Sequence, residues 1–518
     1  MKRNLVIACM AAAAGAAVVF YAAPFQGPVQ PVTGLIPPGA LLCLEAKDFH
    51  AELSAWNASP EKQRWLASAR YEGFSRSNLF LKLAAAWQEF SSAAGFVPDW
   101  ALADSLAGRE SALALYDIGN LQFLYVTRLP GARSMQSALW QSRGRYETRH
   151  AGGFEFFVRT AGGRTVAFAA AGDCLILATR EEYVAGALRL LSGERLPAVM
   201  DDGWYKQATA AASAPGDIRL VMNLEELLKT PQFRSYWIQR NVSEIRLYSA
   251  GIADIHRADG GIREERVLIR KTETAAVPAG GAERLARLAP DGAAFYRAWS
   301  SPQGGDVADL IERKILWPKV AALPNRDYAP EVDVDAPPPA PDEADLETRI
   351  DLPPLEATAD PQAQALRSLL RTAQLTAALQ VQTGQPLPDG VFVQTPSVIA
   401  VESAAAWDAA AVRTALPQAA VQGNLLLIAN SEELLRQVTA RMSRRPAAGD
   451  STSIAVFRHA EAQQDYRKIM CTLERGSGSF FSFDLASLSE VFRSVRGVEI
   501  QTRDQGGVVR ESVYFVPR

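Results

Sequence analysis

Apolar residues recur along the chain with two different periods, and these predict an alternation of helices and strands. Spacings of three and four residues predict helices at residues 50–56, 61–71, 79–94, 100–107 and 135–141. A period of two predicts two strands within residues 111–129, joined by a turn at Gly119-Asn120. Glycine-containing turns then divide residues 146–179 into short strands, and a helix at 181–191 closes this block.

The pattern continues with shorter, more closely connected elements. It predicts a strand at 218–222, a helix at 225–239, a hairpin at 244–269 turning at 259–261, a helix at 364–381, and strands at 391–394 and 398–402. Most connections are too short for crossover helices. We therefore expect an α+β fold whose sheets are mainly antiparallel.

The N-terminal segment differs from the rest because it is apolar on every helical face. Two cations, Lys2 and Arg3, precede the 19-residue uncharged run Leu5–Ala23, which indicates an export signal with the N-terminus cytoplasmic. The run is longer than a usual cleavable signal, and Tyr21 and Pro24 make a poor cleavage site. We expect a signal anchor or signal peptide at 1–26, and a spacer at 27–36.

Two other processing routes compete with an uncleaved anchor. Cleavage would release the body to the periplasm. Lipidation at Cys9 would need a longer apolar stretch before the cysteine than the chain has. An uncleaved anchor predicts a single-pass protein of the inner (cytoplasmic) membrane, held through residues 5–23, with its C-terminal body on the periplasmic side.

The remainder divides into two segments of similar organisation. Residues 37–272 form the first predicted α+β domain, and residues 286–518 form the second. Within the second, residues 324–361 are rich in proline and acidic residues with almost no apolar periodicity, which predicts a disordered insertion.

Four matches in the same order suggest that the second segment duplicates the first. Residues 37–40 match 290–293, 172–182 match 423–433, 218–228 match 454–469 more loosely, and 260–267 match 506–513. In the second match, Thr179 with Glu182 and Asn430 with Glu433 have the spacing of helix caps. A tandem pair of domains is the simplest explanation, and chance recurrence of turn–strand–helix patterns is the alternative.

On these motifs the chain resembles a loose class of exported bacterial proteins of unknown function. The shared features are the Pro-x-Gly-Ala strand openings and the strands followed by a helix that starts with paired glutamates. The resemblance covers much of residues 36–270 and less of the second half. It implies no active site, because these motifs are structural.

Composition narrows the choice of function only slightly. The 518 residues are 48% apolar and 21% charged, with a net charge of −3, which argues against a nucleic-acid partner. Cys43, Cys174 and Cys471 form no CxxC pair, and we expect buried thiols at Cys43 and Cys174, although the sequence cannot assign or exclude a disulfide. The four histidines have no metal-ligand spacing, so we predict neither metal nor cofactor.

Three local patterns have both a functional and a structural interpretation. Ser59-x-x-Lys62 matches the nucleophile and base of penicillin-binding enzymes, but no Lys-Thr-Gly strand accompanies it, and Ser59 with Pro60 is typical of a helix start. Asp201-Asp202 beside two aromatic residues fits sugar chemistry less well than a helix N-terminus. The run 263–266 predicts cross-strand ion pairs on a solvated face.

The sequence thus predicts no catalytic, cofactor-binding or metal residues. The leading hypothesis is a membrane-anchored envelope module that binds a protein or small-ligand partner, in the cleft between the two copies. The alternatives are an envelope hydrolase whose site forms only in three dimensions, and a structural assembly subunit marked by an exposed apolar patch. The ligand and the oligomeric state stay open at this point.

Overall fold

A computed structural model describes the chain at residues 30–67, 78–129, 131–233, 245–258, 261–316, 361–383, 396–417, 419–458 and 495–517. The predicted leader, most of the acidic insertion and the predicted strand 391–394 lie outside these residues. Among the described residues, no helix has the length and apolarity needed to cross a membrane.

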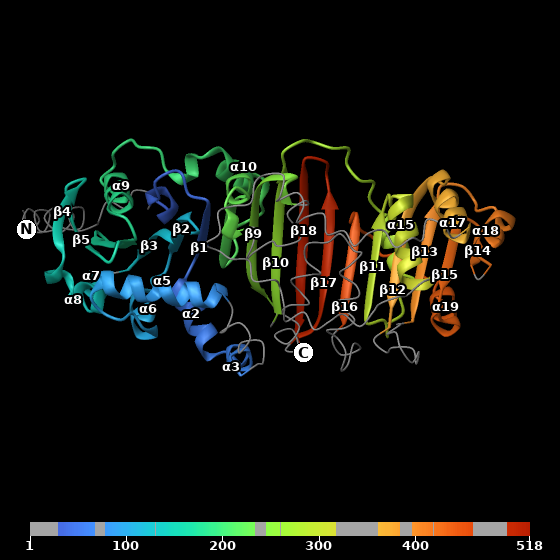
Figure 1. The fold of residues 1–518 in the computed structure, drawn as a ribbon, viewed down its shortest axis with the longest axis horizontal. Coiled ribbons are helices and arrows are strands. Elements are labelled where there is room, and N and C mark those ends of the chain that lie inside the picture. Colours follow the sequence, from blue (N-terminus) through green and yellow to red (C-terminus); the bar gives the residue numbers. More distant parts are fainter. Residues whose placement is uncertain are drawn as a thin grey trace, which may run out of the picture.

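The described strands join in one 18-stranded antiparallel sheet that runs along the whole molecule (Figure 1). In the first half the strands are β1 (Leu42–Ala46), β2 (Ser111–Asp117), β3 (Gln122–Arg128), β4 (Glu147–Ala151), β5 (Phe154–Ala161), β6 (Arg164–Ala171), β7 (Cys174–Ala178), β8 (Ile218–Asn223), β9 (Tyr248–Ala258) and β10 (Gly261–Arg270). In the second half they are β11 (Phe295–Ser300), β12 (Leu375–Gln382), β13 (Ser397–Ser403), β14 (Ala420–Gln422), β15 (Leu425–Ala429), β16 (Ser453–Arg458), β17 (Val495–Asp504) and β18 (Val508–Pro517). The expectation of an α+β protein with antiparallel pairing is confirmed.

The order of the strands is mirrored about the central pair, β10 and β18. Outward from this pair, one half runs β10-β9-β8-β1-β2-β3-β7-β6, and β5 and β4 extend it. The other half runs β18-β17-β16-β11-β12-β13-β15-β14. At the centre Glu265 pairs with Ser512, so the halves meet through a hydrogen-bonded ladder and share one sheet.

Helices cover both faces of the sheet towards its two ends. In the first half these are η1 (Val32–Leu35), α2 (Phe49–Ala58), α3 (Pro60–Leu66), α5 (Asn78–Ala94), α6 (Trp100–Leu106), α7 (Gly131–Ser134), α8 (Ala138–Gln141), η2 (Arg143–Arg145), α9 (Glu181–Leu191), η3 (Val199–Asp201), α10 (Gly203–Ala211), α11 (Leu224–Leu227) and α12 (Pro231–Phe233). In the second half they are α14 (Gly281–Ala286), α15 (Gly304–Ile311), η6 (Glu312–Leu316), α17 (Pro361–Thr372), α18 (Ala409–Ala415) and α19 (Glu432–Thr439).

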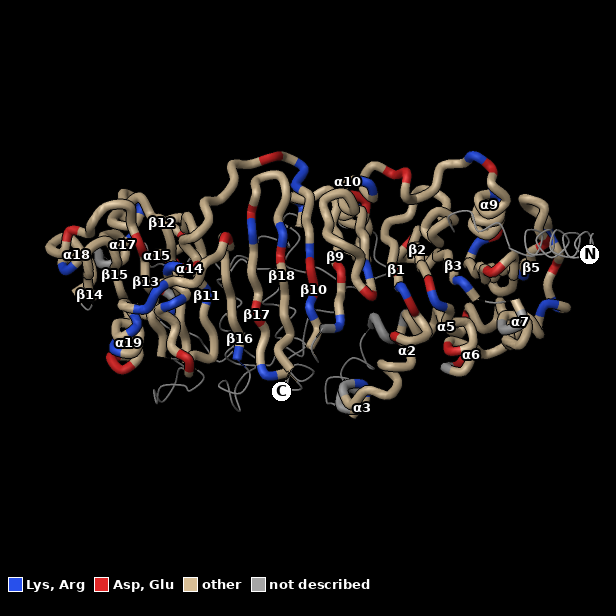
Figure 2. The backbone as a smooth tube through the Cα atoms, turned by 180° about the vertical axis from the view of Figure 1, so that it is seen from behind, with Lys and Arg blue, Asp and Glu red and all other residues tan. Residues whose placement is uncertain are grey.

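One face of the sheet, named here the α9 face, carries η1, α9 and α10 in the first half and α14 and α19 in the second. Their apolar residues form two buried clusters with inward-facing strand residues such as Cys43, Val221, Ala298 and Leu379. The opposite face carries α5 to α8 and, in the other half, α15, α17 and α18. The middle strands β17 and β18 have no described helix packed extensively on them, as both views show (Figures 1 and 2).

Two predicted helices are partly wrong. The predicted helix 364–381 is the helix α17 followed by the strand β12, whose side chains are buried on both faces. A strand buried on both faces lacks the polar alternation that would distinguish it from a buried helix. The described part of the predicted helix 225–239 is divided between the short helices α11 and α12, with Pro231 starting the second, and residues 234–239 lie outside the described residues.

The caps predicted from the duplicated motif are also wrong, by one residue. In both α9 and α19 the residue one position later is the N-cap. Thr179 and Asn430 instead hold the neighbouring strand: Thr179 Oγ1 accepts a hydrogen bond from Phe123 N at 2.8 Å, and Asn430 Oδ1 accepts one from Ser397 N at 2.7 Å. The same side-chain bond therefore recurs at matching places in the two halves.

Candidate binding groove

A polar groove lies on the α9 face of the second half, and we name it the α14 groove. Its volume is about 360 Å³, within the usual range for small-ligand sites. It is lined by Glu283, Ala286, Arg287, Tyr296, Arg444, Arg445, Ala447, Ile454, Val456, Glu499 and Gln501. These residues come from α14, the strands β11, β16 and β17, and the loop after α19.

The floor of the groove consists of two adjacent rows of the sheet. Tyr296 pairs with Val456, which pairs with Glu499, and in the next row Ile454 pairs with Gln501. Directly paired residues of neighbouring strands point to the same face, so these five side chains share one surface. The floor thus places two aliphatic side chains between an aromatic one and two polar ones.

The walls are the helix α14 and the loop that follows α19. Two side chains connect these walls: one belongs to α14 and the other follows its C-terminal end. Arg287 donates from Nη1 to the carbonyl oxygens of Met442, at 3.0 Å, and Arg444. Glu283 is buried, and its Oε1 accepts a hydrogen bond from Ser451 N at 2.7 Å. Both ends of the loop are therefore tied to α14, which gives the groove a preformed wall.

Tyr296 is the aromatic residue of the floor, and its hydroxyl remains a donor at neutral pH. Burial raises the pKa of Tyr296, the nearby Arg458 lowers it, and Glu499 raises it further. The guanidinium carbon of Arg458 lies 5.7 Å from the centre of the Tyr296 ring, a cation–π contact. Arg458 Nη1 is itself held by the carbonyl oxygen of Pro290 at 3.0 Å.

The groove therefore presents charges of both signs around an apolar strip. Glu499 at the edge of the floor and the loop residues Arg444 and Arg445 are exposed at the rim, while Val456 is buried beneath the groove. Such a lining can bind a ligand with apolar groups and both acidic and basic ends. In the described part of the chain, no group of three His, Cys, Asp or Glu side chains is placed to hold a metal ion.

The matching place in the first half holds a buried polar cluster instead of a groove. Arg219 and Asp254 form a bidentate ion pair at 2.7 and 2.8 Å, and they are only 7% and 2% exposed. Glu45 lies opposite Arg219 in the neighbouring strand and accepts a hydrogen bond of 2.6 Å from the hydroxyl of Tyr205 on α10. The helix α10 thus closes over the position that stays open in the second half.

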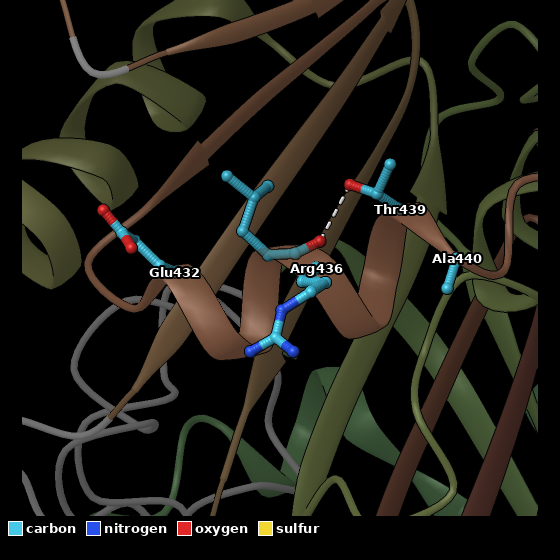
Figure 3. A pocket seen from close by; sticks show the side chains of 5 residues that line it. Glu432, Arg436, Thr439 and Ala440 are labelled. Atoms are coloured by element: carbon cyan, nitrogen blue, oxygen red, sulfur yellow. Dashed lines mark hydrogen bonds between the residues drawn. The ribbon is translucent and has the colours of Figure 1, made fainter.

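A second depression, of about 470 Å³, runs along α19 (Figure 3). It is lined by Glu432, Leu435, Arg436, Thr439 and Ala440, all on or next to this helix. Thr439 Oγ1 donates to the carbonyl oxygen of Leu435 at 2.8 Å, and Arg436 is paired with Glu433. A depression lined by a single helix has no opposing wall, so we assign it no ligand.

Ser59 and Lys62 act as helix-start residues and not as a nucleophile and base. Ser59 Oγ accepts a hydrogen bond from the main-chain N of Lys62 at 3.2 Å and donates to the carbonyl oxygen of Trp56. Lys62 Nζ donates to Asn57 Oδ1 at 2.5 Å. The interpretation of Ser59 as the cap before Pro60 is confirmed.

Asp201 and Asp202 are directed to different partners. Asp201 Oδ2 accepts from Ala198 N at 3.0 Å, and Asp202 Oδ2 accepts from Gly39 N at 3.1 Å. Asp202 occupies the N-cap position of α10 but makes no side-chain cap bond there, so the predicted capping role is wrong in that detail. The two carboxylates form no paired acid–base site.

The run 263–266 lies on β10 and forms the predicted ion pairs in part. Arg266 pairs with Glu264 at 2.5 Å on its own strand and lies 3.9 Å from Glu511 on β18. These side chains are less than a fifth exposed, so the face is not solvated as predicted. Glu265 points to the opposite face, because successive strand residues alternate.

The cysteines at 43 and 174 are buried free thiols, as predicted. Burial raises the pKa of the Cys174 thiol to about 12, with Asp173 adding to the effect. Cys9 and Cys471 lie outside the described residues. Both described thiols are therefore protonated at neutral pH and unreactive.

Sequence reasoning missed every residue of the α14 groove. Glu283, Tyr296 and Glu499 come from three distant segments and belong to no motif. The one usable signal was the position of Glu499 and Gln501, polar residues that alternate with Val498 and Ile500 just before the matched segment 506–513. That alternation predicts that one face of the strand is polar, but it does not predict which segments of the chain pack around that face.

Comparison with known proteins adds little. No protein-family model and no curated protein matches the chain. Among solved structures, crystal form I of TP0453 is similar at 11% identity over 48% of this chain and 82% of that chain, with a TM-score of 0.24. Crystal form IV is similar at 10% identity over 46% of this chain and 81% of that chain, with a TM-score of 0.25. Likeness at this level carries no argument about function.

Proposed function

We propose that this protein is a membrane-anchored, non-catalytic binding module of the cell envelope, and that the α14 groove holds a short peptide segment of its partner. The observation that carries the proposal is the groove itself: an apolar strip between rim charges of both signs, with a wall tied at both ends. A peptide offers side chains, charged groups and main-chain polar groups that match such a lining.

The proposal includes a tandem duplication of the two halves. The mirrored strand order supports it. The match of residues 37–40 with 290–293 aligns β1 with β11 in the sequence, and these two strands hold equivalent places in the mirrored order. The recurring bonds of Thr179 and Asn430 support it as well. In this proposal the two copies diverged at equivalent positions. The position in the first half became covered by α10, and the position in the second half stayed open as the α14 groove.

The anchor is the second part of the proposal. Leu5–Ala23 would hold the protein in the inner membrane with its body on the periplasmic side. Membrane fractionation with alkaline extraction tests this part alone. A soluble mature form starting near residue 24 would contradict it and favour periplasmic release.

The groove is tested with tetrapeptides that have one acidic and one basic end around two apolar residues. Binding to the full chain in lipid nanodiscs is measured by saturation-transfer NMR, with Arg445→Glu as the groove variant. We expect this variant to weaken binding about tenfold, the effect of losing one charge-assisted contact. Arg195→Glu changes an exposed arginine of the first half and serves as the matched control, which should bind as the wild type does.

Three results would count against this function. Absence of binding by every peptide of the set would exclude the peptide class. Equal binding by wild type and Arg445→Glu would place the site elsewhere. Cleavage of the peptides by the purified protein would favour the hydrolase alternative.

A further inference from the structure

The strand β4 is the outermost strand of the first half, and one of its two edges is open (Figure 1). Among the described strands, β4 pairs with β5 alone. Four of its five residues are exposed, so this edge is accessible to solvent. An open edge is a place where a further strand can add to a sheet.

The hairpin of β4 and β5 determines which main-chain groups of the edge are available. The loop consists of residues 152–153, two glycines with φ of 55° and 80°. A two-residue loop of this kind closes on a hydrogen-bonded pair, here Ala151 with Phe154. Since such pairs alternate along the ladder, the N–H and C=O groups of Thr148 and His150 point away from β5.

The charged side chains of β4 alternate with these positions and lie on the α9 face. Arg149 lies 3.8 Å from Glu181, the first residue of α9. Glu147 pairs with Arg149 at 2.7 Å from two residues away, so both share this face. Their side chains are 73% and 49% exposed, which leaves both within reach of a neighbouring strand. A charged edge of this kind repels most strands and selects one with complementary charges.

A second copy of β4, placed antiparallel to the first, has complementary charges in one register. Outward-facing residues must pair with each other, because only they offer main-chain groups to the new ladder. When Thr148 pairs with Thr148 of the second copy, each Glu147 lies directly opposite an Arg149. These are non-hydrogen-bonded pairs, in which the side chains approach most closely.

The neighbouring registers are unfavourable. A shift of two residues in one direction places Arg149 opposite Arg149, and the same shift in the other direction places Glu147 opposite Glu147. Like charges directly opposite each other are destabilising. A further shift past Arg149 meets the turn at residues 152–153. In the favoured register, Tyr146 continues the ladder, because its backbone is already extended (φ −112°, ψ 151°).

We propose that β4 pairs with β4 of a second copy about a twofold axis at Thr148, which joins two sheets into one. Two Glu147–Arg149 pairs then form across the axis, and His150 of each copy lies opposite Tyr146 of the other. The contact closes with two copies, because both use the same edge. The dimer presents one α14 groove towards each of its ends, but the inference depends neither on that groove nor on the anchor.

The strand β14, which ends the other half of the sheet, is a poorer partner for β4. It has three residues, Ala420, Val421 and Gln422, and none of them is charged. Pairing β4 with β14 of another copy would therefore leave Glu147 and Arg149 without new counter-ions. Such a contact would also extend into open chains of molecules, because it uses two different edges.

Disulfide trapping tests the register. Thr148→Cys is introduced into the full chain with Cys9 and Cys471 replaced by serine, and the protein is oxidised after reconstitution in phospholipid vesicles. The two Cα atoms at position 148 should lie about 5.5 Å apart, within disulfide range, so we expect a covalent dimer on non-reducing gels. His150→Cys is the matched control on the same strand and face. Its two Cα atoms should lie about 13 Å apart, too far for a disulfide.

Exchange of charges tests the ion pairs. Glu147→Arg and Arg149→Glu are each added to the Thr148→Cys chain, and each places like charges opposite each other twice. We expect the rate of cross-linking to fall about tenfold in either variant alone. A mixture of the two variants, distinguished by tags of different size, restores opposite charges in both pairs and should cross-link as fast as the parent chain. Far-UV circular dichroism should be unchanged, because both side chains are exposed.

Four results would overturn the inference. Absence of cross-linking at Thr148→Cys would mean that the edge stays solvated or receives another protein. Equal cross-linking at positions 148 and 150 would exclude the register. A mixture that reacts no faster than either charge variant alone would exclude the ion pairs. Oligomers larger than a dimer in sedimentation velocity of the wild type in detergent would favour pairing of β4 with β14.

Discussion

The two halves of the sheet differ at one equivalent pair of strand positions, which is covered by a helix in the first half and open in the second. In the first half, Arg219 and Asp254 form a buried ion pair across β8 and β9. In the second half, Ile454 and Gln501 are the pair at the same place in β16 and β17. The helix α10 covers the first position, whereas the second is the floor of the α14 groove.

This difference shows that the strand residues tolerated at a position depend on whether a helix covers them. A charge under a helix must be paired, because water no longer solvates it. Arg219 and Asp254 satisfy one another, and Asp254 also accepts a hydrogen bond from Gly216 N at 2.8 Å. A floor in contact with solvent or a ligand needs no such pairing, so Ile454 and Gln501 are tolerated there.

The largest expected effect comes from breaking the buried pair. Arg219→Ala leaves the carboxylate of Asp254, which is 2% exposed, without its counter-ion. We expect the free energy of unfolding to fall by about 3–5 kcal/mol. Urea denaturation followed by far-UV circular dichroism measures this change.

The second half supplies the matched control for this variant. The double variant Arg219→Ile/Asp254→Gln copies Ile454 and Gln501 into the first half. Replacing a buried ion pair by neutral residues is often nearly neutral, so we expect stability within about 1 kcal/mol of the wild type. If the double variant were as unstable as Arg219→Ala, the two positions would not be equivalent.

An intermediate effect is expected at the recurring side-chain bonds. Thr179→Ala removes the acceptor for Phe123 N, and Asn430→Ala removes the acceptor for Ser397 N. Each loss should destabilise the protein by about 1–2 kcal/mol, because a main-chain donor loses its partner. Thermal unfolding of the two variants measures both losses, and very different values would argue against an equivalent role in the two halves.

The smallest effect is a pH dependence confined to the first half. Burial raises the pKa of Glu45, the Tyr205 hydroxyl and Arg219 lower it, and Asp254 adds to the increase. Since the folded state favours the protonated carboxyl, Glu45 contributes stability at a pH below its unfolded pKa, and this contribution is lost as the pH rises through the folded pKa.

The variant Glu45→Gln removes this titration. We expect wild type to lose stability relative to Glu45→Gln as the pH is raised above about 4.3, the ordinary pKa of a glutamate. Urea midpoints measured across the acid range test the sign. A stability difference that does not change with pH would mean that Glu45 ionises as freely in the folded chain as in the unfolded one.

Much of the local structure was predictable from the sequence. The helix 181–191 and the hairpin of β9 and β10 follow from periodicity and from turn glycines. The boundary between α17 and β12 was not predictable, because both are apolar where they are buried. The α14 groove was not predictable either, since Tyr296, Glu283 and Glu499 meet only after the strands pair.

By itself, the sequence determined most of the segments that form helices and strands, and that their pairing is antiparallel, because periodicity and connection length act over a few residues. Only the tertiary structure decided that β10 pairs with β18 to make a single sheet. It also decided that α10 covers Glu45, which accepts a hydrogen bond from the Tyr205 hydroxyl, and that the matching surface of the second half stays open as the α14 groove. These contacts join residues far apart in the chain, and the free energy that selects them comes from burial and from pairing buried charges, which no local pattern records.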